Sequence, residues 1–170
     1  MVSDTAVWTL RIRTVAVRAM ASSIGSVKAP FKFSARTRVG FSDTDAQGIV
    51  YYGRYLPYLD LARVEYHRKL GLLGMEIGEP GVEFVMRACT IEYHAPAVFD
   101  DELELFIRVA RIGRTSATYE CAAYRASDDA LMVTATQTLV LVDLEERKAC
   151  ELPQEFHDTI RAFEGDDVAG

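Results

Sequence analysis

The chain has 170 residues, of which 49% are hydrophobic and 26% are charged, and its formal net charge is −6. This length and composition are typical of one globular domain, and they exclude a wholly disordered chain and a collagen-like repeat. Five of the 19 Lys and Arg residues fall within residues 1–32, whereas the rest of the chain is acidic. The domain therefore lacks the basic surface expected of a nucleic-acid-binding protein.

Residues 1–32 form a basic segment that differs from the rest of the chain. Arg11, Arg13, Arg18 and Lys28 lie among Ser and Thr residues, a composition typical of an organelle transit peptide. The segment has no continuous apolar stretch of the kind found in secretory signals, and the chain has no run of about 20 apolar residues that could span a bilayer. We favour a flexible extension, with Met20 as an alternative start, and expect a cytoplasmic protein without a transmembrane segment.

Hydrophobic periodicity predicts the elements that follow. Alternating apolar residues predict a strand over 33–41. From about Gly53 the spacing becomes helical, and Tyr55, Leu59, Ala62, Tyr66 and Leu70 share one face. Basic residues in the last turn and then Gly71 mark the end of this helix. Four more strands are predicted over 82–94, 102–109, 117–123 and 131–143.

The order of these elements predicts an α+β domain over residues 33–164. Short links between consecutive strands indicate antiparallel pairing. One long helix with a wide apolar face is buried best when a curved antiparallel sheet of about five strands wraps around it. A short C-terminal helix over 153–163 follows, and the acidic tail 165–170 is expected to fray. Such a sheet leaves edges uncovered, so self-association is expected.

The cysteines and histidines do not indicate a metal site or a disulfide framework. Cys89, Cys121 and Cys150 lie far apart, which favours buried, reduced thiols. The chain has three histidines, and none lies three to five residues from another. His67, near the end of the predicted helix, is expected at the surface. The chain also lacks the G-x-S-x-G, G-x-G-x-x-G, P-loop and H-E-x-x-H motifs.

The segment from Phe41 to Tyr55 is the strongest candidate for a functional site. It places Asp43 and Asp45 shortly before the start of the long helix. Either carboxylate could simply brace the loop by accepting backbone N–H groups. Alternatively, the helix N-terminus could polarise a substrate carbonyl while a carboxylate attacks it or activates water.

The stretch from Val39 to Tyr66 resembles the entry motif of the 4-hydroxybenzoyl-CoA thioesterase family, which has the hot-dog fold. It is especially similar to the bacterial acyl-CoA thioesterases associated with the Tol-Pal system. Phe84 to Leu103 and Ile112 to Ser116 also resemble this family, so the likeness covers about residues 33–152. The Tol-Pal-associated enzymes usually carry His where this chain has Tyr52.

This resemblance implies the following roles. Asp45 is the catalytic carboxylate, the backbone N–H of Tyr52 polarises the carbonyl, and Gly48 lets the loop turn tightly. Asp43 is expected to hold the loop. Residues implied in substrate binding are Gly53, Tyr55, Leu59, Phe84, Val85, Arg111, Arg114, Thr115 and Ser116, with Arg54 and Arg87 as further candidates for the phosphates of coenzyme A. The family shares its site between subunits, which implies a homodimer or homotetramer.

The expected activity is hydrolysis of a fatty or aromatic acyl-CoA, without metal or cofactor, because coenzyme A is part of the substrate. Two alternatives remain at this point. A hot-dog hydratase or dehydratase requires an acid–base pair, usually with His, and no His falls in residues 43–55. A non-catalytic acyl-CoA-binding module would have the same fold.

Overall fold

The computed structural model describes residues 28–73 and 81–170. Its five long strands are β1 (Ser34–Arg38), β2 (Val82–Tyr93), β3 (Glu102–Ile112), β4 (Ser116–Arg125) and β5 (Leu131–Asp143). They form one antiparallel sheet in the order β1-β3-β4-β5-β2, and the short β6 (Lys148–Ala149) pairs with β5.

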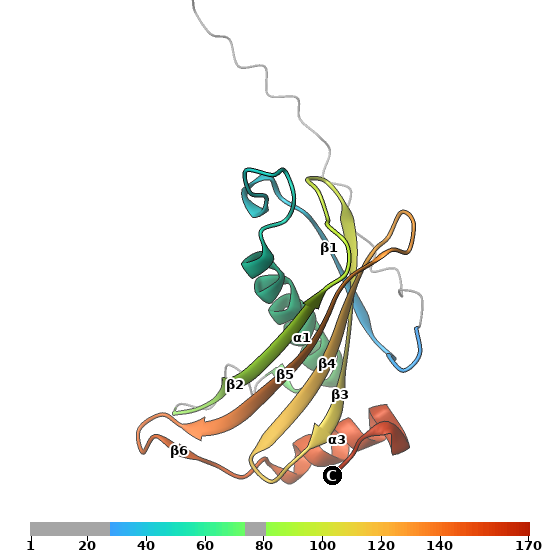
Figure 1. Cartoon of the computed structure of the whole chain (residues 1–170). Helices are drawn as coiled ribbons and strands as arrows, with labels where there is room; N and C mark the ends of the chain where they lie inside the picture. The colour runs from blue at the N-terminus through green and yellow to red at the C-terminus, as the bar shows by residue number, and fades with distance from the viewer. Residues whose placement is uncertain (1–27, 74–80) are drawn as a thin grey trace, which may run out of the picture.

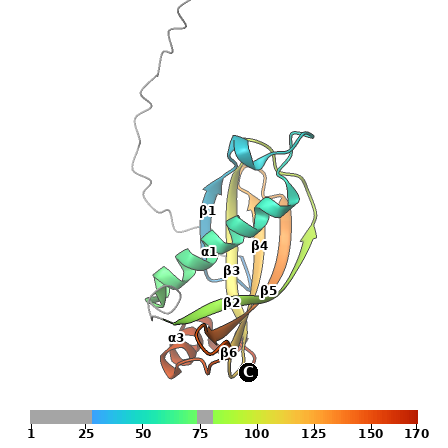
Figure 2. The same cartoon turned by 90° about the vertical axis from the view of Figure 1, so that its left-hand side faces the viewer.

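The sheet curls around helix α1 (Tyr55–Leu70), which lies against one of its faces (Figures 1 and 2). The predicted apolar face is the buried one, since Tyr55, Leu59, Ala62 and Tyr66 are all inaccessible or nearly so. Gly71 ends the helix with φ of 75° and donates its N–H to Arg68 and His67 carbonyls, as the sequence predicted. The predicted hot-dog architecture is confirmed.

One strand pairing differs from the simplest expectation. Strands β3, β4 and β5 pair in chain order, but β2 pairs with β5 and not with β3, although only a short loop joins β2 to β3. This loop, residues 94–101, crosses the end of the sheet instead of forming a hairpin. As a result β2 is an edge strand, and most of its side chains are exposed.

Three local expectations are wrong. Cys89 lies on the edge strand β2 and is exposed, whereas Cys121 is buried; all three thiols are free. His67 is fully buried, because its ring faces the sheet and Nε2 lies 2.9 Å from the Tyr119 hydroxyl. The tail is not frayed: Gly165–Asp167 form a short 3-10 helix, and Ala169 exchanges backbone hydrogen bonds with β3.

The sheet has two distinct ends. The segment before α1, the loop 94–101 and the β4–β5 turn lie at one end, and helix α3 (Gln154–Glu164) lies at the other (Figure 1). The β3–β4 turn also lies at the α3 end, where the Arg114 carbonyl accepts the Leu152 N–H just before α3. The 11 residues of β3 separate the two ends, and at about 3.3 Å per residue this is a span of about 30 Å.

Candidate functional site

The segment that carries both aspartates folds into a small hairpin directly before α1. Thr44 and Val50 form an antiparallel bridge, and the Asp45 N–H donates to the Ile49 carbonyl at 2.9 Å. The turn closes with Gly48 N–H donating to the Asp45 carbonyl at 3.0 Å. Gly48 has φ of 77°, a conformation that favours glycine and lets the hairpin turn tightly.

Asp43 holds this hairpin on the helix start. One of its carboxylate oxygens accepts two guanidinium N–H groups of Arg54, and the other accepts the Tyr58 hydroxyl at 2.6 Å and the Gly40 N–H at 2.9 Å. Burial works to raise the pKa of Asp43, but the hydrogen bonds from Tyr58 and Arg54 outweigh it and lower that pKa. A buried carboxylate with this set of donors serves structure, as predicted.

Asp45 lies in a different environment two residues later. Its side chain is only partly buried, and its carboxylate accepts the Gln47 backbone N–H, at 2.8 Å from Oδ1. The side-chain nitrogen of Gln47 can lie 2.9 Å from both carboxylate oxygens when the amide is turned toward them. Asp45 therefore keeps a carboxylate that incoming molecules can reach.

The helix start supplies the second element of the site. A 3-10 turn over Tyr52–Arg54 leads directly into α1, so the Tyr52 N–H is the first of the helical amides. The first N–H groups of a helix have no partner within it, and the helix dipole makes this end electropositive. The Tyr52 carbonyl accepts the Tyr93 hydroxyl at 3.1 Å, which ties the turn to the end of β2.

Exposed aromatic rings surround this region. The rings of Tyr51 and Tyr52 lie 4.3 Å apart, and the Tyr52 side chain is 63% exposed. Tyr93 is half-exposed, and its ring lies 5.8 Å from that of Tyr55. Such a surface suits contact with an apolar ligand or with another copy of the chain.

The structure divides the predicted site residues between the two ends of the sheet. Asp45, Gly48, Tyr52, Gly53 and Tyr55 lie together at the hairpin end. Within one protomer, the β3–β4 turn holds the remaining polar candidates at the α3 end, namely Arg111, Arg114, Thr115 and Ser116.

The apolar candidates are also divided. Leu59 is fully buried in the core. Phe84 packs against His67 and Phe156 toward the α3 end, whereas the adjacent Val85 is 44% exposed on the edge strand. Among the described polar candidates, Arg54 lies beside the Asp45 hairpin through its contact with Asp43, whereas the β3–β4 turn lies at the opposite end of the sheet.

Several contacts that support the hairpin were not predicted from the sequence. The clamp of Arg54 and Tyr58 on Asp43 could have been suspected from their positions one helical turn apart, on the helix start beside the loop. The support from the loop 94–101, where the Ala97 carbonyl accepts the Val50 N–H at 2.8 Å, had no local signal because it joins distant segments.

The site shows no sign of metal chemistry in the part of the chain that the structure describes. No group of three or more His, Cys, Asp or Glu side chains is arranged to hold an ion there. His94 contacts Thr134 at 2.8 Å and His67 is buried under the sheet, so neither belongs to the Asp45 hairpin. Within residues 28–73 and 81–170, no helix is long and apolar enough to cross a membrane.

The curled sheet around one helix, with a carboxylate hairpin at the helix start, defines an α+β protein of the hot-dog fold. Comparison with known proteins agrees: residues 39–160 match the model of the thioesterase-like superfamily. The chain therefore belongs to this superfamily.

Its relatives include acyl-CoA thioesterases. The chain is 34% identical over 125 residues to the acyl-CoA thioesterase YbgC of Haemophilus influenzae, covering 72% of this chain and 90% of that protein. It is 31% identical to a probable thioesterase of Bartonella henselae, whose crystal structure it matches with a TM-score of 0.63 over 71% of this chain and 98% of the other. A 1,4-dihydroxy-2-naphthoyl-CoA thioesterase from Synechocystis shares the fold, with a TM-score of 0.70, 24% identity, and coverage of 75% of this chain and 94% of that one.

Proposed function

We propose that this protein hydrolyses the thioester bond of a fatty or aromatic acyl-CoA, releasing the free acid and coenzyme A. One observation carries the proposal: Asp45 presents an accessible carboxylate on a rigid hairpin at the N-terminus of α1, while Asp43 is fully engaged in holding that hairpin. Membership of the thioesterase-like superfamily and the named YbgC relatives support the same activity.

In this mechanism the thioester carbonyl oxygen accepts the Tyr52 N–H at the helix start. The helix dipole and this donor stabilise the negative charge that develops on the oxygen. Asp45 then acts by one of two routes. It attacks the carbonyl carbon to form a mixed anhydride, the C–S bond breaks, and water hydrolyses the anhydride. Alternatively, it takes a proton from water, hydroxide attacks the carbon, and the thiolate leaves.

No cofactor enters either route, because coenzyme A arrives with the substrate. A thiolate is a good leaving group and needs less protonation than an alkoxide. The absence of His from residues 43–55 is therefore compatible with hydrolysis.

We further propose that two copies of the chain pair along β2 to complete the site. The outer edge of this strand is unpaired among the described residues, and Val85, Met86 and Tyr93 are large exposed apolar side chains on it. An exposed strand with such residues favours pairing with a second copy. A twofold axis across β2 makes the new pair antiparallel.

Antiparallel pairing of two copies would bring together the predicted site residues that lie at opposite ends of one sheet. The end of β2 near Tyr93 would lie beside the start of the partner's β2. The α3 end of one copy would then approach the Asp45 hairpin of the other. In this arrangement Arg111, Arg114, Thr115 and Ser116 are available to the phosphates of coenzyme A from the opposite subunit, and Val85 to the acyl group.

Replacing Met86 by Lys tests this pairing, because a charge in the paired edge opposes association. Light scattering should show an oligomer for the natural protein and a monomer for the variant, with thiol release reduced at least tenfold. The matched change Leu144→Lys, at an exposed apolar residue after β5, should alter neither. A monomeric natural protein with full activity contradicts the shared site.

Asp45→Asn tests the activity itself. Thiol release from short, long and aromatic acyl-CoAs should fall by about 10²-fold or more in kcat, the scale of a lost acid–base group. Asp166→Asn, a matched change in the exposed 3-10 turn after α3, should keep full activity. Equal turnover by Asp45→Asn and the natural protein would remove Asp45 from the mechanism.

The same panel separates the alternative functions. Hydration of crotonyl-CoA without thiol release would identify a hydratase. Tight binding of acyl-CoA without turnover would identify a binding module.

A further inference from the structure

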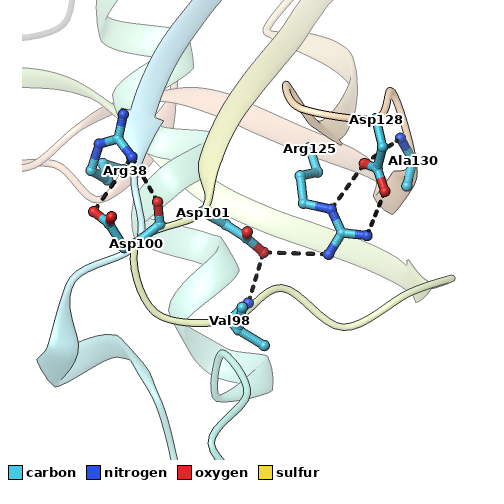
Figure 3. Close-up of polar contacts among 7 residues, drawn as sticks. All are labelled: Arg38, Val98, Asp100, Asp101, Arg125, Asp128 and Ala130. Carbon is cyan, nitrogen blue, oxygen red and sulfur yellow. Dashed lines mark hydrogen bonds and ion pairs between the residues drawn. The ribbon is translucent and has the colours of Figure 1, made fainter.

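The loop 94–101, between β2 and β3, is held in place by arginines on both sides (Figure 3). On one side Arg38, the last residue of β1, donates to the Asp100 carbonyl at 2.7 Å. On the other side Arg125, the last residue of β4, contacts the Asp101 carboxylate at 3.4 Å. Asp100 itself has φ of 72°, so the backbone turns sharply between the two contacts.

Arg125 is well fixed. Its Nε and one terminal nitrogen donate to the two carboxylate oxygens of Asp128, both at 2.9 Å, and the remaining nitrogen faces Asp101. The Arg125 and Asp101 side chains are only 24% and 18% exposed. The bidentate pair with Asp128 is directional and holds the guanidinium in one orientation, so the remaining nitrogen of Arg125 makes its single contact with Asp101 from a fixed position.

Asp101 connects Arg125 to the loop backbone through hydrogen bonds. The carboxylate oxygen that faces Arg125 also accepts the Val98 N–H at 2.9 Å, and the Asp101 N–H donates to the Val98 carbonyl at 3.2 Å. Figure 3 shows the Asp101 carboxylate between Arg125 and Val98. This carboxylate therefore fixes the conformation of residues 98–101.

The loop then contacts the Asp45 hairpin through its backbone. Val98 forms a bridge with Ile49, and the Ala97 carbonyl accepts the Val50 N–H at 2.8 Å. The Ile49 carbonyl is in turn the acceptor of the Asp45 N–H. An unbroken series of hydrogen bonds runs from Arg125 through Asp101 and the loop to the backbone of Asp45.

We propose that Arg125 and Asp101 are positioning residues for Asp45, although neither touches the substrate. The inference rests on the proposed function of Asp45. Loop 94–101 has no helix or strand of its own. Backbone hydrogen bonds join its ends to Met132 and Val39, and the Asp101 carboxylate adds the side-chain contact that orients residues 98–101 toward the hairpin. A shift of about 1 Å in a reacting group can cost up to about 10²-fold in rate. Loss of the pair therefore lowers turnover without removing a group from the site.

The test compares Arg125→Met with Arg108→Met. Arg108 forms an ion pair with Glu120, at 2.8 Å, between strands β3 and β4, and also donates to the Asp167 carbonyl, but among the described residues it makes no hydrogen bond or ion pair with loop 94–101. Arg125→Met should lower kcat by about 5- to 30-fold with KM within twofold, and Arg125→Lys should restore part of the loss. Arg108→Met should keep kcat within twofold. Equal kcat for the two methionine variants overturns the proposal.

Asp101→Asn provides a second variant that removes only the charge and keeps the side-chain shape. It should lower kcat in the same way as Arg125→Met, and unchanged kcat in this folded variant would also overturn the proposal. Thermal melting of each variant establishes that the measured protein is folded.

A double variant distinguishes positioning from a general loss of structure. Because Arg125 acts through Asp45, Arg125→Met should not further reduce the residual activity of Asp45→Asn. An additional loss equal to that in the natural background would overturn the proposal. Full activity of Asp45→Asn alone would instead refute the proposed role of Asp45, and absence of thiol release by the natural protein would refute the proposed function, so these failures are distinguishable.

Discussion

The two ends of the curled sheet are held together by different kinds of contact. At the Asp45 end, polar and charged side chains hold loops: Arg54 and Tyr58 hold Asp43, and Arg125 holds Asp101. At the α3 end, buried aromatic rings fill the space between helix and sheet, with centroids 5.7 to 6.3 Å apart in a cluster of His67, Phe84, Phe156, Tyr66 and Tyr119.

The two kinds of contact contribute differently to the stability of the fold and to the position of the Asp45 carboxylate. Burial of apolar surface contributes about 25 cal/mol per Å² but is not directional. A hydrogen bond contributes only about 0.5–1.5 kcal/mol net, yet it depends strongly on distance and angle. The α3 end therefore supplies much of the stability, and the Asp45 end uses weaker, directional contacts to place a carboxylate.

The largest effect is expected from breaking the Asp43 clamp. Asp43→Ala leaves the buried Tyr58 hydroxyl and the Arg54 guanidinium without their acceptor. Unfolding free energy should fall by about 2–3 kcal/mol, the cost of unsatisfied buried and charged groups. Activity should also fall at least tenfold, because the hairpin that carries Asp45 loses its anchor. Urea unfolding and thiol release measure the two effects.

Tyr58→Phe is the matched control for this clamp. It removes one of the hydrogen bonds to Asp43 but keeps the ring, so it should cost about 1 kcal/mol and leave most of the turnover. If Asp43→Ala unfolds more easily yet keeps normal kcat, the clamp contributes to stability alone and the separation between the two ends is wrong.

Local sequence patterns were sufficient to predict much of the Asp45 end. The alternation from Phe33, the helical spacing from Tyr55 and the turn-forming Gly48 are all short-range signals, and each marks a real element, although β1 ends at Arg38 and the exposed Phe41 begins a 3-10 turn. Asp43 holds the loop as expected, because its contacts lie within 15 residues, whereas the catalytic role of Asp45 stays a prediction.

Long-range arrangement was harder to predict. The position of β2 beside β5 is set by pairing between distant segments, and this made Cys89 exposed. The burial of His67 depends on the Tyr119 hydroxyl, which lies 52 residues away in the chain. The ties between loop 94–101 and the hairpin have the same origin. Periodicity reports which residues are apolar, but it does not report which distant strand they meet.

The second-largest expected effect is a change of folding stability with pH, which depends on the buried His67 at the α3 end. Burial, with a smaller contribution from Arg63, lowers the pKa of His67 from 6.5 to about 3. The unfolded chain therefore binds a proton at this residue below pH 6.5, whereas the folded protein does not until about pH 3. Folding stability should decrease as the pH falls below 6.5, by up to about 1.4 kcal/mol per pH unit.

His67→Gln isolates this contribution. Glutamine can still contact the Tyr119 hydroxyl but does not titrate. Burial raises the pKa of nearby Glu164, which acts in the opposite direction in both proteins and cancels in the comparison. Urea unfolding at pH 7.5, 6 and 5 should show a steeper loss for the natural protein. Parallel curves would show that His67 is protonated in the folded state.

The smallest effect lies midway between the two ends, at Gln137. This side chain is fully buried on β5, where its amide faces the Cys89 thiol, a weak hydrogen-bonding group, and neither amide atom has a nitrogen or oxygen partner among the described residues. A buried polar group without partners costs about 1–3 kcal/mol. Gln137→Met, which keeps a similar volume, should therefore stabilise the protein by about 1 kcal/mol, or raise Tm by about 2–4 °C.

The Gln137→Met variant also tests whether a polar side chain in the middle of the sheet affects the functional site. Cys89, its neighbour on β2, lies on the strand edge proposed to meet a second copy of the chain. If the amide has no role in the site, Gln137→Met should melt higher and keep the kcat and KM of the natural protein. A higher Tm combined with a raised KM for some acyl groups would extend the polar, positioning contacts from the Asp45 end to the middle of the sheet. A lower Tm would mean that the Gln137 amide forms stabilising hydrogen bonds in solution, and the prediction that its burial is costly would be wrong.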